Sequence, residues 1–248
     1  MSDARGQIVA MGGGGFSMEE TPLLDDFVLS LVPHRAAGAV RVCFVPTASA
    51  DSPAYLVKFY RAFSGRAVAT DLTFANPTSP SRRPASSAEL ADYVAAQDVI
   101  YVGGGNTANL LAVWRAHGLD RVLRDAWTRG AILCGVSAGM LCWFRDGVTD
   151  SFGPLARLGD GLGLLDASAC PHYDGEPGRR AAFHAAIADG MAPGWAADDG
   201  AALHFVGTEL VEVVSSRRAA AAYRVERVDG VVVETRLPVR FLGAESGA

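Results

Sequence analysis

The sequence predicts an α/β protein with a mainly parallel sheet flanked by helices and a β-rich C-terminal extension. Short, continuously apolar segments alternate with helix-like segments between residues 7 and 136, which is typical of parallel strands buried on both faces. After residue 200, four strand-like segments follow one another with short breaks, as antiparallel hairpins do. The chain shows no linker and no internal repeat. We therefore expect a single α/β domain over residues 1–248.

Five apolar segments are expected to form the main strands. They are QIVAM (7–11), RVCFVP (41–46), AVATDLTF (67–74), DVIYVG (98–103) and AILCGV (131–136). Between them, apolar residues recur at helical spacing in 21–32, where Thr21-Pro22 is a plausible N-cap and first-turn pair, and in 52–63. A Pro- and Ser-rich loop (76–87) precedes a short helix, and one or two helices are expected in 106–129. The C-terminal strands are AALHFV, ELVEVVSS, AAYRVER and GVVVETRL.

Composition excludes several classes of partner. Half of the 248 residues are hydrophobic and a fifth are charged, as in a soluble globular protein with a large core. The net charge of -5 argues against nucleic-acid binding. No segment reaches the length of a membrane helix and no secretory signal is visible, so we expect a cytoplasmic protein without a membrane partner. The four cysteines form no CxxC pair, which favours buried free thiols and no metal site.

Three of the expected strands end in distinctive turns: MGGGG (11–15), YVGGGNT (101–107) and CGVSAGM (134–140). In open parallel sheets the functional crevice lies at the carboxyl ends of the strands. These turns are therefore the places where chemistry is expected.

The third turn contains GVSAG, which fits the Gly-x-Ser-x-Gly elbow that projects a serine hydroxyl above a sheet. Strand before and helix after are the context that this motif requires. The helix would direct N–H groups and its positive end at a developing oxyanion. Small residues also suit a tight strand-to-helix connection without any catalysis, so Ser137 alone leaves both interpretations open.

The other two turns are less specific. In VGGGNT, the backbone N–H of Gly105 is an oxyanion-hole candidate, although a glycine-rich turn serves equally as a plain connection. MGGGGF follows the first strand as a dinucleotide fingerprint would. However, Ser17 occupies the third glycine position, and Val45-Pro46 stands where an acidic residue is required. We therefore expect no cofactor.

Five histidines are candidates for the general base. His172 lies in the polar loop CPHYDGEP and is the leading candidate if Ser137 is a nucleophile. His204, inside AALHFV, is the fallback. His34, His117 and His184 are expected at the surface of helices or helix ends.

Sequence spacing does not select the acid that would orient the histidine. Asp198-Asp199-Gly200 precedes a strand, and Asp150 in TDSFG follows the elbow. The full set of candidates is Asp146, Asp150, Asp174, Glu176, Asp198 and Asp199.

Taken together, YVGGGNTANLL, RGAILCGVSAGM and CPHYDGE resemble the peptidase E (aspartyl dipeptidase) family, which also includes cyanophycinase. The similarity runs from IVAMGGGGF through CFVPTAS to ADDGAALHFVG. It implies a class I glutamine amidotransferase-like, flavodoxin-like fold in which a serine replaces the elbow cysteine. It also implies hydrolysis of peptide bonds.

The resemblance implies a role for each matching residue. Ser137 matches the nucleophile, His172 the general base, and the N–H groups of Gly105 and Ala138 the oxyanion hole. The downstream acid falls on Asp199, where a glutamate is familiar in the family. Asp150 is the nearest match to a second acid position after the elbow. We place Asp199 first and keep Asp150 open.

The loop after the histidine is shorter than in aspartyl dipeptidases and runs directly into a helix. Arg179 and Arg180 are the basic residues there that would read an acidic substrate side chain. Equally, Arg179 and Arg180 could be solvent-exposed residues at the start of a helix without any role in substrate binding.

We therefore expect a cofactor-free serine peptidase acting on short peptides through a Ser-His-Asp triad, as a monomer or homodimer. One alternative is an esterase using the same elbow, with the chain order Ser, acid, His and with Asp150 or Asp166 as the acid. The other is a non-enzymatic small-molecule-binding protein on an amidotransferase-like fold.

Overall fold

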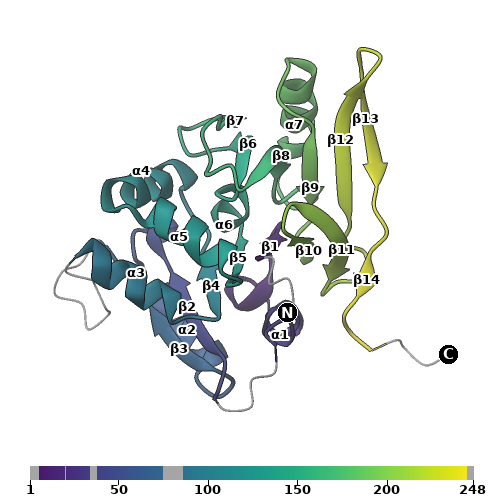
Figure 1. Cartoon of the computed structure of the whole chain (residues 1–248). Coiled ribbons are helices and arrows are strands. Elements are labelled where there is room, and N and C mark those ends of the chain that lie inside the picture. The colour runs from purple at the N-terminus through teal and green to yellow at the C-terminus, as the bar shows by residue number, and fades with distance from the viewer. Residues whose placement is uncertain (1–5, 20, 34–37, 75–85, 245–248) are drawn as a thin grey trace.

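The computed structural model describes residues 6–19, 21–33, 38–74 and 86–244 (Figure 1). His34 and most of the predicted loop 76–87 lie outside these residues. The described chain folds into two sheets, one of eight and one of six strands. The expectation of a mainly parallel sheet flanked by helices is confirmed.

The larger sheet has the strand order β14-β11-β10-β1-β5-β4-β2-β3. Its parallel part consists of β1 (Gln7–Met11), β2 (Arg41–Val45), β3 (Val68–Asp71), β4 (Val99–Val102) and β5 (Ile132–Val136). These are the five strands that the apolar segments predict. Because β1 and β5 are neighbours at its centre, their carboxyl ends lie side by side.

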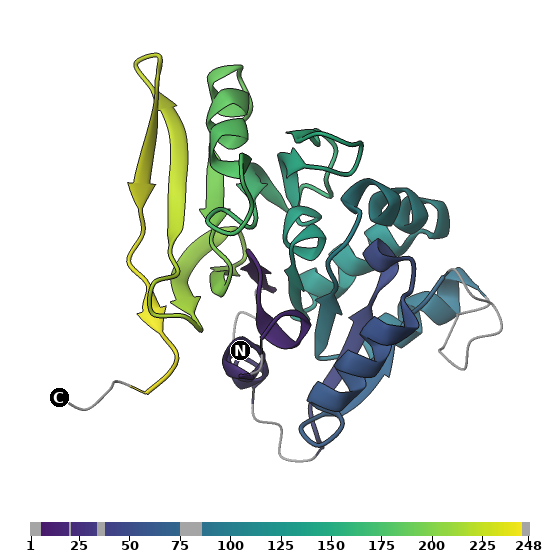
Figure 2. The ribbon, with the colours of Figure 1, turned by 180° about the vertical axis from the view of Figure 1, so that it is seen from behind.

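Both faces of this sheet are covered, which explains the continuous apolar runs. One face packs on α3 (Ser87–Ala95), α4 (Thr107–His117) and α5 (Leu119–Thr128), which lie in front in Figure 1. The opposite face packs on α1 (Leu23–Ser30), α2 (Pro53–Phe63) and the short helix η1 (Gly15–Ser17) (Figure 2). Successive residues of each strand therefore enter different clusters of buried side chains. Ile8 and Val9 of β1 are an example.

The smaller sheet was not expected. Its order is β13-β12-β9-β8-β6-β7. Its parallel members are β6 (Phe144–Thr149), β8 (Leu165–Cys170) and β9 (Gly194–Ala197), and β7 (Ala156–Arg157) pairs antiparallel with β6. The sequences FRDGVT and LDASAC mix charged and small residues and give no apolar run. They become strands because α7 (Arg179–Ala188) and the main core bury one side chain after another.

The predicted C-terminal hairpins are present but belong to different sheets. β10 (Ala201–Val206) and β11 (Glu209–Ser215) pair antiparallel and extend the large sheet beyond β1. β12 (Ala222–Val228) and β13 (Val231–Arg236) pair antiparallel in the small sheet and form the long hairpin at the edge of Figure 1. The short strand β14 (Arg240–Phe241) returns to β11.

Local details follow the sequence closely. The region 106–129 contains two helices, because Gly118 adopts φ 74 and ends α4. Helix α1 begins at Leu23, one residue later than Pro22 suggested. All four cysteines are buried and free. Among the described residues no helix has the length and apolar character to cross a membrane.

Candidate active site

Ser137 connects β5 to α6 (Ala138–Leu141) with φ 59 and ψ −109, a conformation that L-residues adopt only under strain. The helix can approach the sheet this closely because Gly139 has no side chain. A Cβ there would overlap the Val102 carbonyl. A strained strand-to-helix turn is the backbone geometry that a nucleophile elbow requires. Since α6 has only four residues, individual N–H groups act here rather than a helix dipole.

The glycine turn after β4 lies directly beside this serine. A Cβ on Gly104 would be 3.4 Å from the Ser137 Cβ and 3.9 Å from its Oγ. The Gly104 N–H is already bonded to the Tyr55 hydroxyl at 3.3 Å. Among the residues that the structure describes, the N–H groups of Gly105 and Ala138 have no hydrogen-bond acceptor. Two donors beside the serine are thus available to an oxyanion.

The end of β1 anchors both the serine and the histidine. The Ser137 N–H donates to the Met11 carbonyl at 3.1 Å, and the His172 N–H donates to the Gly12 carbonyl at 3.2 Å. His172 has φ 53 and is buried. Two consecutive carbonyls, of the last residue of β1 and of the glycine after it, therefore hold the two residues that the sequence singled out for nucleophile and base.

Asp199 lies behind this histidine. Its Oδ1 is 2.6 Å from His172 Nδ1, a hydrogen bond between the buried histidine and a partly buried carboxylate. This bond from His172 lowers the pKa of Asp199 against the effect of burial, and the charges of His172, Arg217 and Arg179 add to the lowering. In a hydrolase triad, the acid is an ionised carboxylate that accepts a hydrogen bond from Nδ1 of the histidine.

A family comparison accords with this geometry. The model of peptidase family S51 matches residues 8–213. The chain belongs to peptidase family S51. This is the peptidase E family that the motifs resemble, and the chain is accordingly a serine-type peptidase.

Two relatives of this S51 peptidase are named as peptidases. It is 49% identical over 240 residues to the uncharacterized peptidase YgaJ of Bacillus subtilis (strain 168), covering 96% of this chain and 99% of the relative. It is 30% identical over 144 residues to the uncharacterized peptidase PM1590 of Pasteurella multocida (strain Pm70), covering 55% of this chain and 66% of that one.

Solved structures share the fold of the S51 peptidase. A peptidase from an acI-B1 actinobacterium superimposes with a TM-score of 0.71 at 18% identity, covering 94% of each chain. A putative peptidase E protein from Listeria monocytogenes EGD-e does so with a TM-score of 0.57 at 19% identity, covering 94% of this chain and 99% of the other. The fold implied by the sequence motifs is thereby confirmed.

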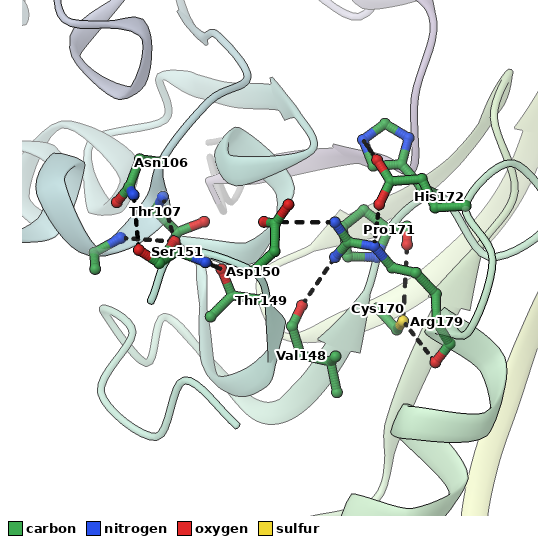
Figure 3. A network of polar contacts seen from close by, with 12 residues as sticks. Asn106, Thr107, Val148, Thr149, Asp150, Ser151, Cys170, Pro171, His172 and Arg179 are labelled. Carbon is green, nitrogen blue, oxygen red and sulfur yellow. Dashed lines mark hydrogen bonds and ion pairs between the residues drawn. The ribbon is translucent and has the colours of Figure 1, made fainter. Parts of the chain in front are cut away.

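Asp150, the other acid kept open by the sequence, has different surroundings in the S51 peptidase (Figure 3). Its side chain is 60% exposed, and its partner is the Arg179 guanidinium at 3.7 Å. Its neighbour Ser151 caps α4, because the Ser151 Oγ accepts hydrogen bonds from the N–H groups of Thr107 and Ala108 at 2.9 and 3.3 Å. The loop carrying Asp150 therefore supports the helix that follows the glycine turn.

The two arginines considered for substrate recognition have partners inside the peptidase. Arg179 is buried, and it donates to Glu176 Oε2 at 2.6 Å and to the Val148 carbonyl at 3.2 Å (Figure 3). Arg180 stacks on Tyr173 and Tyr223, with its guanidinium carbon 5.2 and 5.1 Å from the ring centroids. Its guanidinium also forms a bidentate ion pair with Glu234.

The remaining sequence candidates have structural partners. His204 packs on Phe27 and bonds to Gln7 at 2.8 Å, and burial lowers its pKa. Asp146 accepts hydrogen bonds from Arg157 and from two backbone N–H groups. Asp166 pairs with Arg145 at the surface.

Several residues at the site were not singled out from the sequence. In the sequence, Gly12 and Gly13 belong to the turn that resembles a dinucleotide fingerprint. In the structure, Gly13 forms an isolated β-bridge with Asp199. A Cβ on Gly13 would overlap Asp199 Oδ1 and lie 3.1 Å from His172 Nδ1. The run of glycines after β1 was the available signal, and its cause is close approach of the acid. Arg217 carried no signal in the sequence.

The described part of the chain contains no group of three or more His, Cys, Asp or Glu side chains with metal-binding geometry.

Proposed function

We propose that this S51 peptidase hydrolyses short peptides through an acyl-enzyme on Ser137, with His172 as general base and Asp199 as the orienting acid. The observation that carries the proposal is the 2.6 Å bond between His172 Nδ1 and Asp199 Oδ1. An ionised carboxylate can only accept, so Nδ1 carries the proton and Nε2 keeps its lone pair. His172 then has the tautomer that a general base requires.

The proposed reaction has two steps. His172 Nε2 removes the proton of the Ser137 hydroxyl as Oγ attacks the peptide carbonyl, and it then delivers that proton to the leaving amine. Water, deprotonated by His172, then attacks the ester carbonyl. The ester bond to Oγ breaks as His172 returns this proton to Oγ, which releases the acid product and restores Ser137. The N–H groups of Gly105 and Ala138 stabilise the oxyanion in both steps. Removal of one such donor costs on the order of 10²–10³ in kcat in a serine peptidase.

The nucleophile is tested by measuring the hydrolysis of a set of dipeptides by Ser137→Ala. The control is Ser64→Ala, which changes an exposed serine at the C-terminal end of helix α2. We expect loss of activity on the order of 10⁶-fold in Ser137→Ala, as in a comparable serine peptidase, and none in the control. A fluorophosphonate probe should label the wild type and Ser64→Ala but not Ser137→Ala. Equal cleavage by Ser137→Ala with native circular dichroism would rule out this mechanism.

An esterase using the same elbow is the competing reaction. Its chain order requires Asp150 or Asp166 as the acid, and these side chains pair with Arg179 and Arg145. The bond between His172 and Asp199 therefore favours the peptidase proposal. Turnover of p-nitrophenyl esters without any turnover of dipeptides would support the esterase.

We propose a preference for acidic substrate residues on the basis of Arg179 and Arg180. Arg180 is the more accessible of the two, since its side chain is 53% exposed while that of Arg179 is 3% exposed. Comparison of kcat/KM for Asp-Leu and Ala-Leu in the wild type and in Arg180→Ala tests this preference. Equal kcat/KM values for the two substrates in the wild type would rule out the preference for acidic residues.

A further inference from the structure

The turn that carries Asp199 is held by the loop between β11 and β12. The Ser216 N–H donates to the Gly200 carbonyl at 2.9 Å. The Ala221 N–H donates to Asp198 Oδ2 at 2.8 Å. Both ends of the turn are thus bonded to a loop that joins the large sheet to the small one.

Arg217 of that loop closes a ring around the backbone of Asp199. Its Nε donates to the Asp199 carbonyl at 2.7 Å, and its terminal nitrogen binds Asp174 Oδ2 at 2.6 Å. The other oxygen of Asp174 accepts the Asp199 N–H at 2.8 Å. The peptide groups on both sides of the Asp199 Cα are therefore fixed by one ion pair.

Asp174 also belongs to the segment that carries the histidine, two residues after His172. The ion pair between Asp174 and Arg217 therefore connects the loop of the base to the turn of the acid. Loss of either partner would leave the 2.6 Å bond between His172 and Asp199 without this connection.

Arg217 is also a cation in a group of carboxyl side chains. It pairs with Asp174. Its charge adds to the lowering of the Asp199 pKa, which the hydrogen bond from His172 mainly causes. Burial raises the pKa values of Glu19 and Asp198, and the Arg217 charge opposes that rise. The other ionisable groups that face Asp199 are His172 and Arg179, which favour its ionised form. Glu19 acts in the opposite sense, because the charges of Glu19 and Asp199 repel each other.

We propose that Arg217 and Asp174 are positioning residues of this peptidase, which hold Asp199 in the orientation that keeps the His172 ring aligned. The proposal rests on the proposed role of His172 and Asp199 in catalysis. Neither residue is assigned contact with substrate. They act on the reaction only through Asp199.

The chain offers a matched control in Arg115. Arg115 binds both the side chain and the backbone carbonyl of Asp160, at 2.7 Å for the Oδ2 contact. Its side chain is 41% exposed, close to the 48% of Arg217. Arg115→Ala therefore removes the same kind of ion pair at a site that carries no proposed catalytic group.

The kinetic test compares Arg217→Ala, Arg217→Lys and Arg115→Ala. Misplacement of a reacting group by about 1 Å costs roughly 10²-fold, so we expect kcat to fall about 10- to 100-fold in Arg217→Ala with little change in KM. Arg217→Lys keeps the charge but lacks the planar guanidinium fork, whose separate nitrogens contact the Asp199 carbonyl and Asp174 Oδ2, so we expect partial loss. Millimolar guanidinium chloride should restore part of the activity of Arg217→Ala. Arg115→Ala should keep the wild-type kcat.

The pH profile gives a second measurement. Arg217 is one of the charges that lower the pKa of Asp199, after the hydrogen bond from His172, so the pH profile of the Asp199 carboxylate, followed by carbon NMR, should move to higher pH in Arg217→Ala. It should move less in Arg217→Lys. An Asp174→Asn, Arg217→Ala double variant should lose no more activity than the stronger single variant, since both changes act on Asp199.

A measurement without substrate separates this proposal from the proposed function. The proton between His172 Nδ1 and Asp199 should give a downfield NMR resonance in the wild type and in Ser137→Ala, and it should be lost in His172→Ala. We expect it to broaden or shift in Arg217→Ala and to be unchanged in Arg115→Ala. An unchanged resonance together with unchanged kcat and pH profile in Arg217→Ala would overturn the proposal. Equal losses in Arg217→Ala and Arg115→Ala would do the same.

Discussion

Gly13 lies against Asp199 so closely that a Cβ on the glycine would overlap the carboxylate oxygen bonded to His172. Replacement by alanine must therefore displace Asp199 or break its bond. We expect Gly13→Ala to lower kcat about 100-fold or more, with a native circular dichroism spectrum. Gly65→Ala is the control, because nothing lies within 4 Å of a Cβ there. Full activity in Gly13→Ala would show that the carboxylate can move without consequence.

Asp199 and Asp150 can be distinguished by paired amide substitutions. Asp199→Asn places an amide against His172 Nδ1 and favours the wrong tautomer, so kcat should fall by about 10⁴-fold, as for the corresponding change in a serine peptidase. Asp150→Asn changes an exposed side chain whose partner is Arg179 and should leave kcat nearly unchanged. Dipeptide hydrolysis at saturating substrate measures both. The reverse order of effects would assign the acid to Asp150.

Asp25 makes the stability depend on pH near neutrality. It is buried beneath the glycine loop with the Tyr101 hydroxyl at 3.1 Å, and burial raises its pKa to about 7. The folded state keeps this proton while the unfolded chain releases it at pH 4, so stability falls as pH rises from about 4 to about 7.

Asp25→Asn removes that titration and preserves an oxygen for Tyr101. Relative to the wild type, the variant should gain about 3 kcal/mol in the free energy of unfolding between pH 5 and pH 8. Urea unfolding at both values measures it. If the pKa of Asp25 were the same in the folded and unfolded states, the unfolding free energies of the two proteins would change with pH in parallel, which would contradict this prediction.

Glu234 attaches the β12–β13 hairpin to α7. Its carboxylate accepts hydrogen bonds from Arg180, from the Tyr173 hydroxyl at 2.5 Å and from His184 at 2.9 Å. Burial raises the pKa of Glu234, but these hydrogen bonds outweigh it and the pKa is lowered. The bonds therefore contribute stability that is present above pH 4.5 and is lost as the pH falls through the lowered pKa.

Glu234→Gln should destabilise the protein by about 1–3 kcal/mol at pH 7, because three donors lose a charged acceptor. Chemical unfolding at pH 7 measures the loss of unfolding free energy. The difference between variant and wild type should decrease at acidic pH, where Glu234 becomes protonated. Glu226→Gln on β12 is the control, since its partner Arg224 is 3.9 Å away. Similar losses in both variants would show that the network around Glu234 adds no stability.

Much of the fold is predictable from local sequence. The strands of the parallel sheet are continuous apolar runs because both of their faces are covered. The strands at 144–149 and 165–170 were missed, because Asp146, Asp166 and their small neighbours show no alternation or apolar run. The strand at 194–197 was missed because it has only four residues, GWAA. They are stabilised by pairing and by contacts with α7, which are not local in sequence.

For the candidate site, the sequence by itself determined the residues that stand at strand ends. Ser137 sits in a five-residue turn whose small neighbours reflect strand-to-helix packing, and His172 lies in a polar loop. Motif order was then enough to identify the peptidase E family. The family resemblance placed Asp199 before Asp150, and only the tertiary structure shows which of the two carboxylates contacts His172. Asp199 lies 27 residues along the chain and reaches Nδ1 at 2.6 Å, while Asp150, nearer to the elbow in sequence, faces Arg179. It also brought Gly13, Asp174 and Arg217 from three separate segments around that acid. Such contacts depend on how β1, β9 and β11 end beside one another, and spacing along the chain carries no information about that.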